Sequence, residues 1–324
     1  MYHKVDLNDV EYFRKVCGKD HVFYENINEE YSRDEMTEYG SFMPEVLIKA
    51  TDSRQISAVL KYCNEKLIPV TPRGAGTGLC GGSVSVLGGV LLSVELMNRI
   101  LEIDVNTLTA VVEPGVRLME LVAEADRYGL LYAPDPGEKS ASLGGNVMTN
   151  AGGMRAVKYG VTRDYVKGME VVLADGECLK LGGKIAKNSS GYSLKDLMIG
   201  SEGTLGIVTR LYLKLLAKPV KMISLLIPFN DLKSCLSIVP RILALPNRPT
   251  TLEFCEREVI DDSAEYLGKQ FPDTSANAYL LVRLDGPSQD ALKPAIDTLT
   301  DLMLSIGAKD VLLVLTERKT RDEI

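Results

Sequence analysis

Histidine is scarce in this 324-residue chain, which contains only His3 and His21. Both lie in the first tenth of the sequence. A hydrolytic triad usually needs a histidine beside its nucleophile, and many zinc sites use several histidines as ligands. The sequence therefore excludes a histidine-dependent triad or a multi-histidine metal site in the body of this chain, and we expect no metal.

Closely spaced cysteine pairs are also absent. The six cysteines, at positions 17, 63, 80, 178, 235 and 255, include no Cys-x-x-Cys pair. That absence excludes zinc-ribbon, thioredoxin and ferredoxin-type cluster motifs. The first residues, Met1 to Asp6, contain no apolar segment typical of a secretory signal. Scattered cysteines without such a signal indicate reduced thiols, so we expect a cytoplasmic protein.

Basic residues are too few for a nucleic-acid binder. The chain has 37 Lys and Arg against 44 Asp and Glu, a formal charge of -7, whereas nucleic-acid-binding domains normally carry a basic surface. No apolar run approaches the roughly 18 residues that cross a bilayer. Apolar residues make up 45% and charged residues 25%, which is typical of globular proteins. At about 100–200 residues per domain, the length indicates two domains.

The first two thirds of the chain alternate between predicted strands, predicted helices and glycine-rich segments. A polar, helical lead-in covers 1–45. Asp52 is a suitable N-cap for a helix after the strand Val46–Ile48. Further strands are predicted at 68–70, 90–94, 110–113 and 207–216, a helix at 117–128, and a hairpin at 170–174 and 178–181 around Asp175-Gly176.

A boundary is expected at Ala217-Lys218-Pro219, because the sequence beyond it is poor in glycine and regular. We predict a first domain at 1–218, with its core at about 42–218, and a second at 219–324. Strands are predicted at 223–227, 251–254, 278–284 and 310–316, with helices at 231–244, 256–268 and 288–306. This alternation predicts a sheet with helices on one face.

The first glycine cluster, 72–82, follows an apolar strand and contains five glycines within nine residues. Glycines allow backbone N–H groups to converge on an anion such as a pyrophosphate, and Arg73 can add a charged contact. The simpler alternative is a flexible surface loop. Gly76, Gly78 and Gly81 also match G-x-G-x-x-G, with Glu95 downstream, but residues 83–90 form a poor helix. A Rossmann nicotinamide site is therefore the weaker interpretation.

Two more clusters follow, at 141–153 and 200–208. The second offers small residues, the amides of Asn146 and Asn150, and two hydroxyl groups. Such a surface can lie against a flat ring and hydrogen-bond its heteroatoms. A rigid turn, 134–137, precedes it. Three clusters within one region of the chain indicate one large polar ligand rather than three unrelated loops.

In order and spacing, the clusters resemble the FAD-binding domain of the vanillyl-alcohol-oxidase, or PCMH-type, flavoproteins, and within them the group of the glycolate oxidase D subunit and D-lactate dehydrogenases. The matching stretches are Tyr31-Ser32-Arg33-Asp34, Arg73-Gly74-Ala75-Gly76-Thr77-Gly78, Gly144-Gly145-Asn146, Asn150-Ala151-Gly152-Gly153, Lys158-Tyr159-Gly160 and Gly203-Thr204-Leu205-Gly206-Ile207-Val208. The resemblance implies an α+β protein, with a two-subdomain FAD-binding fold followed by an α/β cap domain that contains an antiparallel sheet.

The resemblance also implies the residues that bind FAD. They are Pro72, Arg73, Gly74, Ala75, Gly76, Thr77, Gly78 and Leu79 for the pyrophosphate; Pro136, Gly137, Ser142, Gly144, Gly145, Asn146, Thr149, Asn150, Ala151 and Gly152 around the ribityl chain and ring; and Gly203, Ile207 and Val208 through their backbone. Some relatives attach FAD through a histidine. Both histidines here precede the first cluster, so non-covalent FAD is expected, and Cys80 is expected to be a packed thiol.

The implied activity is oxidation of a D-2-hydroxy acid, of the D-lactate or glycolate class, by hydride transfer to FAD. The resemblance places a carboxylate-binding arginine and a histidine base late in a longer chain, and this sequence has no histidine there. The alternative is an electron-transfer subunit without complete substrate chemistry, with iron–sulfur or electron-transfer flavoprotein partners. Catalytic residues stay unassigned. Arg283, Lys158 and Tyr159 are weak candidates for the substrate or flavin surroundings.

Overall fold

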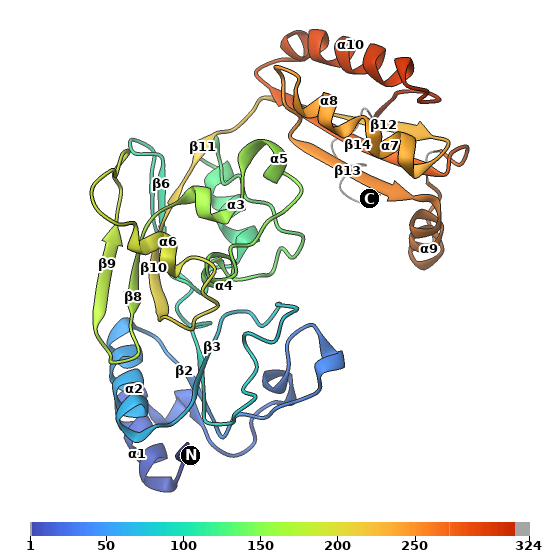
Figure 1. The fold of residues 1–324 in the computed structure, drawn as a ribbon. Coiled ribbons are helices and arrows are strands. Elements are labelled where there is room, and N and C mark those ends of the chain that lie inside the picture. The colour runs from blue at the N-terminus through green and yellow to red at the C-terminus, as the bar shows by residue number, and fades with distance from the viewer. Residues whose placement is uncertain (1, 272, 315–324) are drawn as a thin grey trace. The chain divides into compact units, whose positions relative to one another are not determined.

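The computed structural model describes residues 2–271 and 273–314 (Figure 1). The chain divides into two compact units. The first comprises 1–132, 136–151 and 161–217, and the second comprises 133–135, 152–160 and 218–324. The main division at Ala217 lies beside the boundary expected from the sequence, but two short segments from the first half of the chain also belong to the second unit.

A mixed four-stranded sheet opens the first unit, in the order β1-β2-β4-β3. These strands are β1 (Val22–Phe23), β2 (Val46–Lys49), β4 (Val90–Ser93) and β3 (Val70–Arg73). Helices α1 (Leu7–Cys17) and α2 (Ser53–Lys66) bury their apolar residues against it. Asp52 caps α2 as predicted, because its side chain accepts hydrogen bonds from the backbone N–H groups of Arg54 and Gln55.

An antiparallel five-stranded sheet completes the first unit, in the order β5-β6-β10-β8-β9. Its strands are β5 (Ile100–Asp104), β6 (Thr109–Val112), β10 (Ile207–Lys214), β8 (Val166–Val172) and β9 (Cys178–Gly182). The unit also contains the short strands β7 (Leu130–Leu131) and β11 (Leu216–Ala217), which pair with each other, and the helices α3 (Leu118–Asp126), α4 (Leu143–Met148) and α6 (Leu194–Met198).

The second unit is built on an antiparallel sheet in the order β13-β14-β12-β15. The strands are β13 (Thr251–Glu256), β14 (Ala278–Gly286), β12 (Lys221–Phe229) and β15 (Leu312–Val314). Helices α7 (Leu232–Ser237), α8 (Val239–Leu243) and α10 (Gln289–Ser305) share one apolar core with alternate residues of β12 and β14. The short helix α5 (Ala156–Tyr159) also belongs to this unit.

The α+β class with an antiparallel C-terminal sheet is confirmed, and three details of the second unit differ from prediction. The helix expected at 231–244 is two helices, with Pro240 in the first turn of the second. Ile260 of α9 (Arg257–Leu267) packs in a separate cluster with Leu226 and Tyr279, which face away from the main core, so the helices do not all cover one face. Of the strand predicted at 310–316, residues 312–314 form β15 and the last two lie outside the described residues.

Candidate cofactor site

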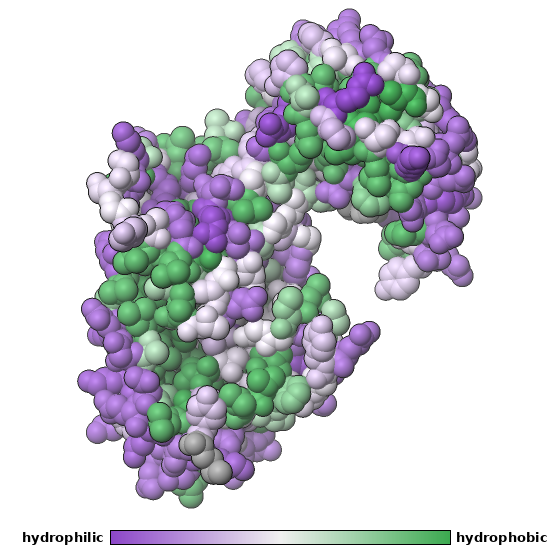
Figure 2. All heavy atoms as spheres, viewed as in Figure 1, coloured by the Kyte–Doolittle hydropathy of each residue, from purple (hydrophilic) through white to green (hydrophobic). Residues whose placement is uncertain are grey.

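The first unit contains a cavity of about 400 Å³, within the range of small-molecule sites. Most of its lining comes from the three glycine clusters, which lie far apart in sequence. The lining residues are Pro72, Arg73, Gly74, Ala75, Gly76, Thr77, Gly78, Leu79, Cys80, Gly82, Ser83, Val94, Pro136, Glu138, Ala141, Ser142, Gly144, Gly145, Asn146, Met148, Thr149, Ala151, Glu202, Gly203, Gly206, Ile207 and Val208. Figure 2 shows a pale band, the colour of near-neutral hydropathy, over the region of α4 and β3.

The loop after β3 presents unpaired backbone donors. Among the described residues, no protein acceptor receives the N–H groups of Gly76, Thr77, Gly78 or Leu79. Gly76 has a φ of 75°, in the left-handed region that favours glycine, and a side chain there would collide with the guanidinium of Arg73. Consecutive free N–H groups with no side chain in front of them form a concave site for an anion.

The side chain of Arg73 makes contacts within the protein that the sequence did not predict. Its guanidinium donates hydrogen bonds to the backbone carbonyls of Glu30, Arg33 and Ser83 at 2.9–3.2 Å. It also lies over the ring of Tyr31, 5.5 Å from the centroid. The residue is buried, and burial lowers the pKa of Arg73. These hydrogen bonds join the segment before β2 to the glycine loop, and Arg73 also belongs to the cavity lining.

Asp34 fixes the far end of the same loop. Its buried carboxylate accepts a hydrogen bond from the backbone N–H of Gly81 at 2.7 Å and another from Met36 at 3.0 Å. The backbone N–H of Glu35 in turn donates to the carbonyl of Gly78. The stretch Tyr31-Ser32-Arg33-Asp34, noted in the sequence, therefore supports the glycine loop.

The second wall of the cavity is α4. Ser142 caps this short helix, and its Oγ accepts N–H bonds from Gly145 and from Ala75 of the glycine loop, both at 3.2 Å. Gly144 is required by close packing, because a Cβ there would lie 2.7 Å from Cβ of Pro114. Asn146 is 5% exposed, and its Nδ2 has no hydrogen-bond partner. A buried amide donor without a partner in a cavity wall is a place for a ligand acceptor.

The third wall is the turn at 200–206. The N–H groups of Gly200 and Glu202 donate to the carbonyls of Val147 and Met148, which docks the turn on α4. Gly203 has a φ of 76°, and a side chain at this position would collide with the ring of Pro72. The turn and the first loop therefore meet by close backbone approach.

The structure brings together in one cavity all but three of the predicted FAD-binding residues. Gly137 is exposed and outside the lining. The side chain of Asn150 accepts a hydrogen bond from the N–H of Arg163, and the residue has a φ of 48°, so it forms a turn. Gly152 belongs to the second unit. Cys80 is exposed and lines the cavity, so its prediction as a packed thiol is wrong.

The prediction did not include several lining residues: Gly82, Ser83, Val94, Glu138, Ala141, Met148, Glu202 and Gly206. Gly82 is the last residue of the first glycine cluster, Ser83 directly follows it, and Gly206 lies inside the third. The extension of each cluster was therefore a signal for them. The sequence gives no such signal for Val94, which has the pattern of an ordinary strand residue.

The weak candidates Lys158, Tyr159 and Arg283 all belong to the second unit. Lys158 and Tyr159 of α5 both hydrogen-bond to the carboxylate of Asp285, with Tyr159 Oη 2.8 Å from Oδ2. The Asp285 side chain is 4% exposed. Arg283, two residues earlier on β14, donates through Nε to Ser224 at 3.2 Å. Asp285 therefore ties α5 to the sheet of this unit.

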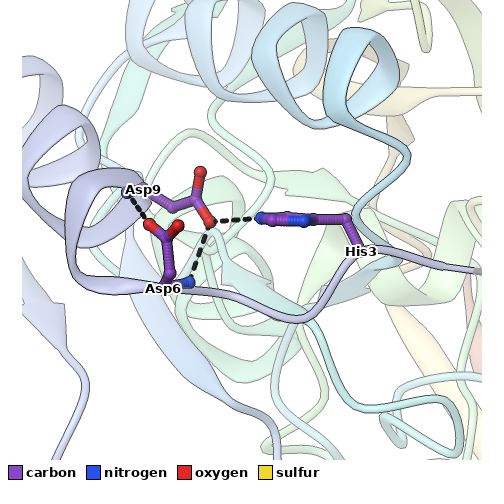
Figure 3. Close-up of side chains that lie close together, drawn as sticks. All are labelled: His3, Asp6 and Asp9. Atoms are coloured by element: carbon purple, nitrogen blue, oxygen red, sulfur yellow. Dashed lines mark hydrogen bonds and ion pairs between the residues drawn. The ribbon is translucent and has the colours of Figure 1, made fainter.

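Among the described residues, one group has the proximity of a metal site: His3, Asp6 and Asp9 (Figure 3). Their atoms are engaged in capping α1. Asp6 accepts from the N–H groups of Asn8 and Asp9, and Asp9 accepts from the N–H of Asp6 and from Tyr62. His3 Nε2 lies 2.8 Å from Asp9 Oδ2. These hydrogen bonds explain why the three side chains lie together: they cap the N-terminus of α1.

The sequence matches two families of flavin enzymes. Residues 44–193 match the FAD binding domain, and residues 218–324 match the C-terminal domain of FAD linked oxidases. Within the part that the structure describes, no helix has the length and hydrophobicity to cross a membrane.

Curated relatives agree with these matches. The D-lactate dehydrogenase of Anaerostipes hadrus is 48% identical over 99% of this chain and 69% of its own length. The glycolate oxidase subunit GlcD of Bacillus subtilis is 44% identical over 79% of this chain and 54% of its own length. The chain thus spans between about half and two thirds of the length of such relatives.

Solved structures share the fold at low sequence identity. Alkyldihydroxyacetonephosphate synthase has a TM-score of 0.81 and 18% identity, over 100% of this chain and 63% of the other. p-Cresol methylhydroxylase has a TM-score of 0.78 and 22% identity, over 97% and 68%. The family matches and the 48% identical relative lead to one conclusion: the chain belongs to the FAD-linked oxidoreductase family that contains D-lactate dehydrogenase and the glycolate oxidase subunit GlcD.

Proposed function

We propose that the cavity of the first unit binds FAD without a covalent bond, and that the protein oxidises a D-2-hydroxy acid of the D-lactate or glycolate class. The observation that carries the proposal is that the cavity offers unpaired hydrogen-bond donors at two places, and FAD has acceptors that suit both. The loop offers the unpaired N–H groups of Gly76 to Leu79 to a pyrophosphate, and Asn146 offers a buried amide donor to a ring or chain acceptor. FAD contains both kinds of acceptor.

The residues present suit a non-covalent cofactor. His3 is engaged with Asp9, and neither His3 nor His21 lines the cavity. The chain's groups would hold and orient the cofactor: the loop at 74–79 would bind the pyrophosphate, and Ser142 and Asn146 would contact the ribityl chain and ring. FAD supplies the hydride acceptor of the reaction. The D-lactate substrate and an acceptor or partner subunit for the electrons are proposed from the names of the relatives.

Visible absorption of the purified protein tests the proposal. We expect a yellow protein that releases FAD on mild denaturation, and bleaching when D-lactate is added without oxygen, with L-lactate as the matched control. A yellow protein that neither D-lactate nor glycolate bleaches would support the alternative, an electron-transfer subunit. A colourless protein that folds but does not take up FAD would overturn the flavin assignment.

A further inference from the structure

Two segments of the first unit lie side by side next to the cofactor cavity: the one that precedes β2 and the loop that follows β3. Backbone hydrogen bonds join them at both ends. Near the start of each segment, the N–H of Glu35 donates to the carbonyl of Gly78 at 3.1 Å. Near their ends, the N–H of Glu45 donates to the carbonyl of Gly89 at 2.8 Å. The two segments therefore form one surface rather than two separate loops.

This loop surface, made of 34–45 and 78–89, carries large apolar side chains that face solvent. Six of them are 39–66% exposed, and they are Tyr39, Phe42, Met43, Leu79, Val86 and Leu87. Single exposed apolar residues are ordinary, whereas a group of them on adjoining segments marks an interaction site. Leu79 also lines the cavity, so the loop surface borders the cofactor site.

The charges beside these apolar side chains are almost all negative. Residues 78–89 contain no charged residue. The exposed charged residues of 29–43 are four glutamates and one arginine: Glu29, Glu30, Arg33, Glu35 and Glu38. Among the described residues, no ion pair neutralises Glu35 or Glu38. Since charge complementarity selects partners and speeds their encounter, the loop surface suits a partner with an apolar centre and a basic rim.

The same charges disfavour two other occupants of the loop surface. A symmetric pair of copies would set the surface against itself, and its glutamates would then face each other. The anionic surface of a membrane attracts basic segments and would repel this acidic one. A basic protein is the occupant that the charges favour.

We infer that the loop surface is the docking site of a basic, electron-accepting protein. The inference rests on the proposed function. Oxidation of one 2-hydroxy acid to the 2-oxo acid releases two electrons and two protons; the electrons must pass to an acceptor, and the protons pass to water. Because Leu79 belongs both to the loop surface and to the cavity lining, a protein docked there lies beside the cofactor. Six apolar side chains make a small contact, which is usual for transient electron-transfer complexes.

Cytochrome c, a basic protein that accepts one electron, is the probe for the test. The FAD-loaded protein is reduced with one equivalent of dithionite, so that no substrate is needed, and is mixed with cytochrome c in a stopped-flow instrument. One molecule of reduced protein should reduce two molecules of cytochrome c. The rate constant of this reaction reports on docking.

Two double variants separate the charges from the apolar contact. The charge variant, Glu35→Lys with Glu38→Lys, should lower the rate constant about tenfold at low ionic strength, within the range of electrostatic steering. At about 1 M salt it should react as the wild type does, because charges are then screened. The apolar variant, Val86→Ser with Leu87→Ser, should lower the rate constant about tenfold at both salt concentrations, since it removes apolar contact and no charge.

The control variant, Glu65→Lys with Glu177→Lys, changes the net charge as much as the charge variant does. Both residues are exposed, on α2 and in the turn between β8 and β9, on the other side of the first unit from the loop after β3 (Figure 1). This variant should slow the reaction far less than the charge variant. Equal slowing would overturn the inference, because net charge alone would then govern the rate, and so would an unchanged rate in the charge variant.

Two further measurements test the other occupants. If the wild type is a dimer by size-exclusion chromatography and the apolar variant is a monomer, the loop surface belongs to a second copy and the inference is overturned. It is also overturned if the wild type binds phosphatidylcholine vesicles and the apolar variant does not. A wild-type protein that binds no FAD would instead contradict the proposed function.

Discussion

The carboxylate of Asp34 and the backbone N–H of Gly81 form a hydrogen bond of 2.7 Å across 47 positions of sequence. Asp34 is 6% exposed. Its second oxygen accepts from Met36. Because the loop at 74–82 is rich in glycine, it loses much conformational freedom when it becomes ordered. A bond from a buried carboxylate to its far end reduces the freedom that FAD would otherwise have to remove.

Asp34→Asn should therefore weaken FAD binding. The amide retains one acceptor oxygen but places an NH2 donor toward an N–H that needs an acceptor. We expect a loss of about tenfold in affinity, for one hydrogen bond to a charged group, measured by quenching of flavin fluorescence. Asp175→Asn is the control, since Asp175 also accepts a backbone N–H, in the turn between β8 and β9. Equal affinity in Asp34→Asn and wild type would contradict the role of this bond.

Two glycines of the loop allow the cost of a left-handed backbone to be measured separately from the cost of a steric collision. Gly76 and Gly81 have nearly the same φ, 75° and 74°. A Cβ at Gly81 meets no atom within 4 Å, whereas one at Gly76 collides with the Arg73 guanidinium. Gly81→Ala should lower the free energy of unfolding by about 1–2 kcal/mol and leave FAD binding measurable. Gly76→Ala should cost more stability and abolish FAD binding.

Chemical unfolding of the apoprotein and a fluorescence titration with FAD measure the two effects. If both alanine variants lose the same stability and the same affinity, the Arg73 contact does not shape the loop, and only the left-handed backbone matters.

The sequence predicted elements whose signals are local. Asp52 was predicted as the N-cap of α2, and its side chain accepts the expected backbone hydrogen bonds; Ile56 and Val59 of the same helix are buried. α4 was less evident, because Gly144 and Gly145 are poor helix formers. This helix depends on tertiary contacts, the packing of Gly144 on Pro114 and the bond from Ala75 to its cap, Ser142.

The role of Arg73 shows why the site was only partly predictable. An arginine beside a glycine loop indicates an anion contact, and nothing local indicates otherwise. Its actual acceptors are carbonyls of Glu30 and Arg33, about forty positions earlier, which only the folded chain brings near. Glu202 also lines the cavity, although the predicted FAD-binding residues did not include it.

Cys80 offers a direct probe of cofactor occupancy. Its thiol is exposed and belongs to the cavity lining, while Cys178 on β9 is equally classed as exposed but lies outside the cavity. We expect bound FAD to slow alkylation of Cys80 by N-ethylmaleimide by at least about tenfold, by covering the loop. Labelling of Cys178 should not change. Mass spectrometry of both peptides gives the rates, and equal labelling of Cys80 with and without FAD would place the cofactor elsewhere.

Removing Lys158 and removing Asp285 should lower the free energy of unfolding by different amounts, although the two side chains form one ion pair. The Asp285 side chain is 4% exposed, and that of Lys158 is 32% exposed. Lys158→Met leaves a buried carboxylate whose remaining side-chain donor, among the residues that the structure describes, is Tyr159. Asp285→Asn instead leaves an ammonium group that can reach water. Breaking a buried pair costs about 3–5 kcal/mol. We expect Lys158→Met to approach the lower end of that range and Asp285→Asn to cost less, in urea unfolding. The reverse order would contradict this account.

The start of α1 should make stability depend on pH through Asp9. Burial favours the neutral carboxyl group, but hydrogen bonds from the N–H of Asp6, from Tyr62 and from His3 outweigh it and lower the pKa of Asp9 below its usual value of 3.8. A carboxylate whose pKa is lower in the folded state stabilises the fold above its unfolded pKa. That contribution is lost as the pH falls through the lowered value.

Asp9→Asn should therefore be less stable than the wild type at neutral pH, and the difference should shrink as the pH falls below 3.8, because the wild type then loses its charge. Urea unfolding at a series of pH values measures the difference. Asp20→Asn is the control, since Asp20 belongs to the short helix that follows α1 and has no capping bond. At neutral pH, Asp20→Asn should lower the free energy of unfolding by less than Asp9→Asn does. A constant difference between wild type and Asp9→Asn down to about pH 2 would show that the capping bonds act through geometry alone, without the charge.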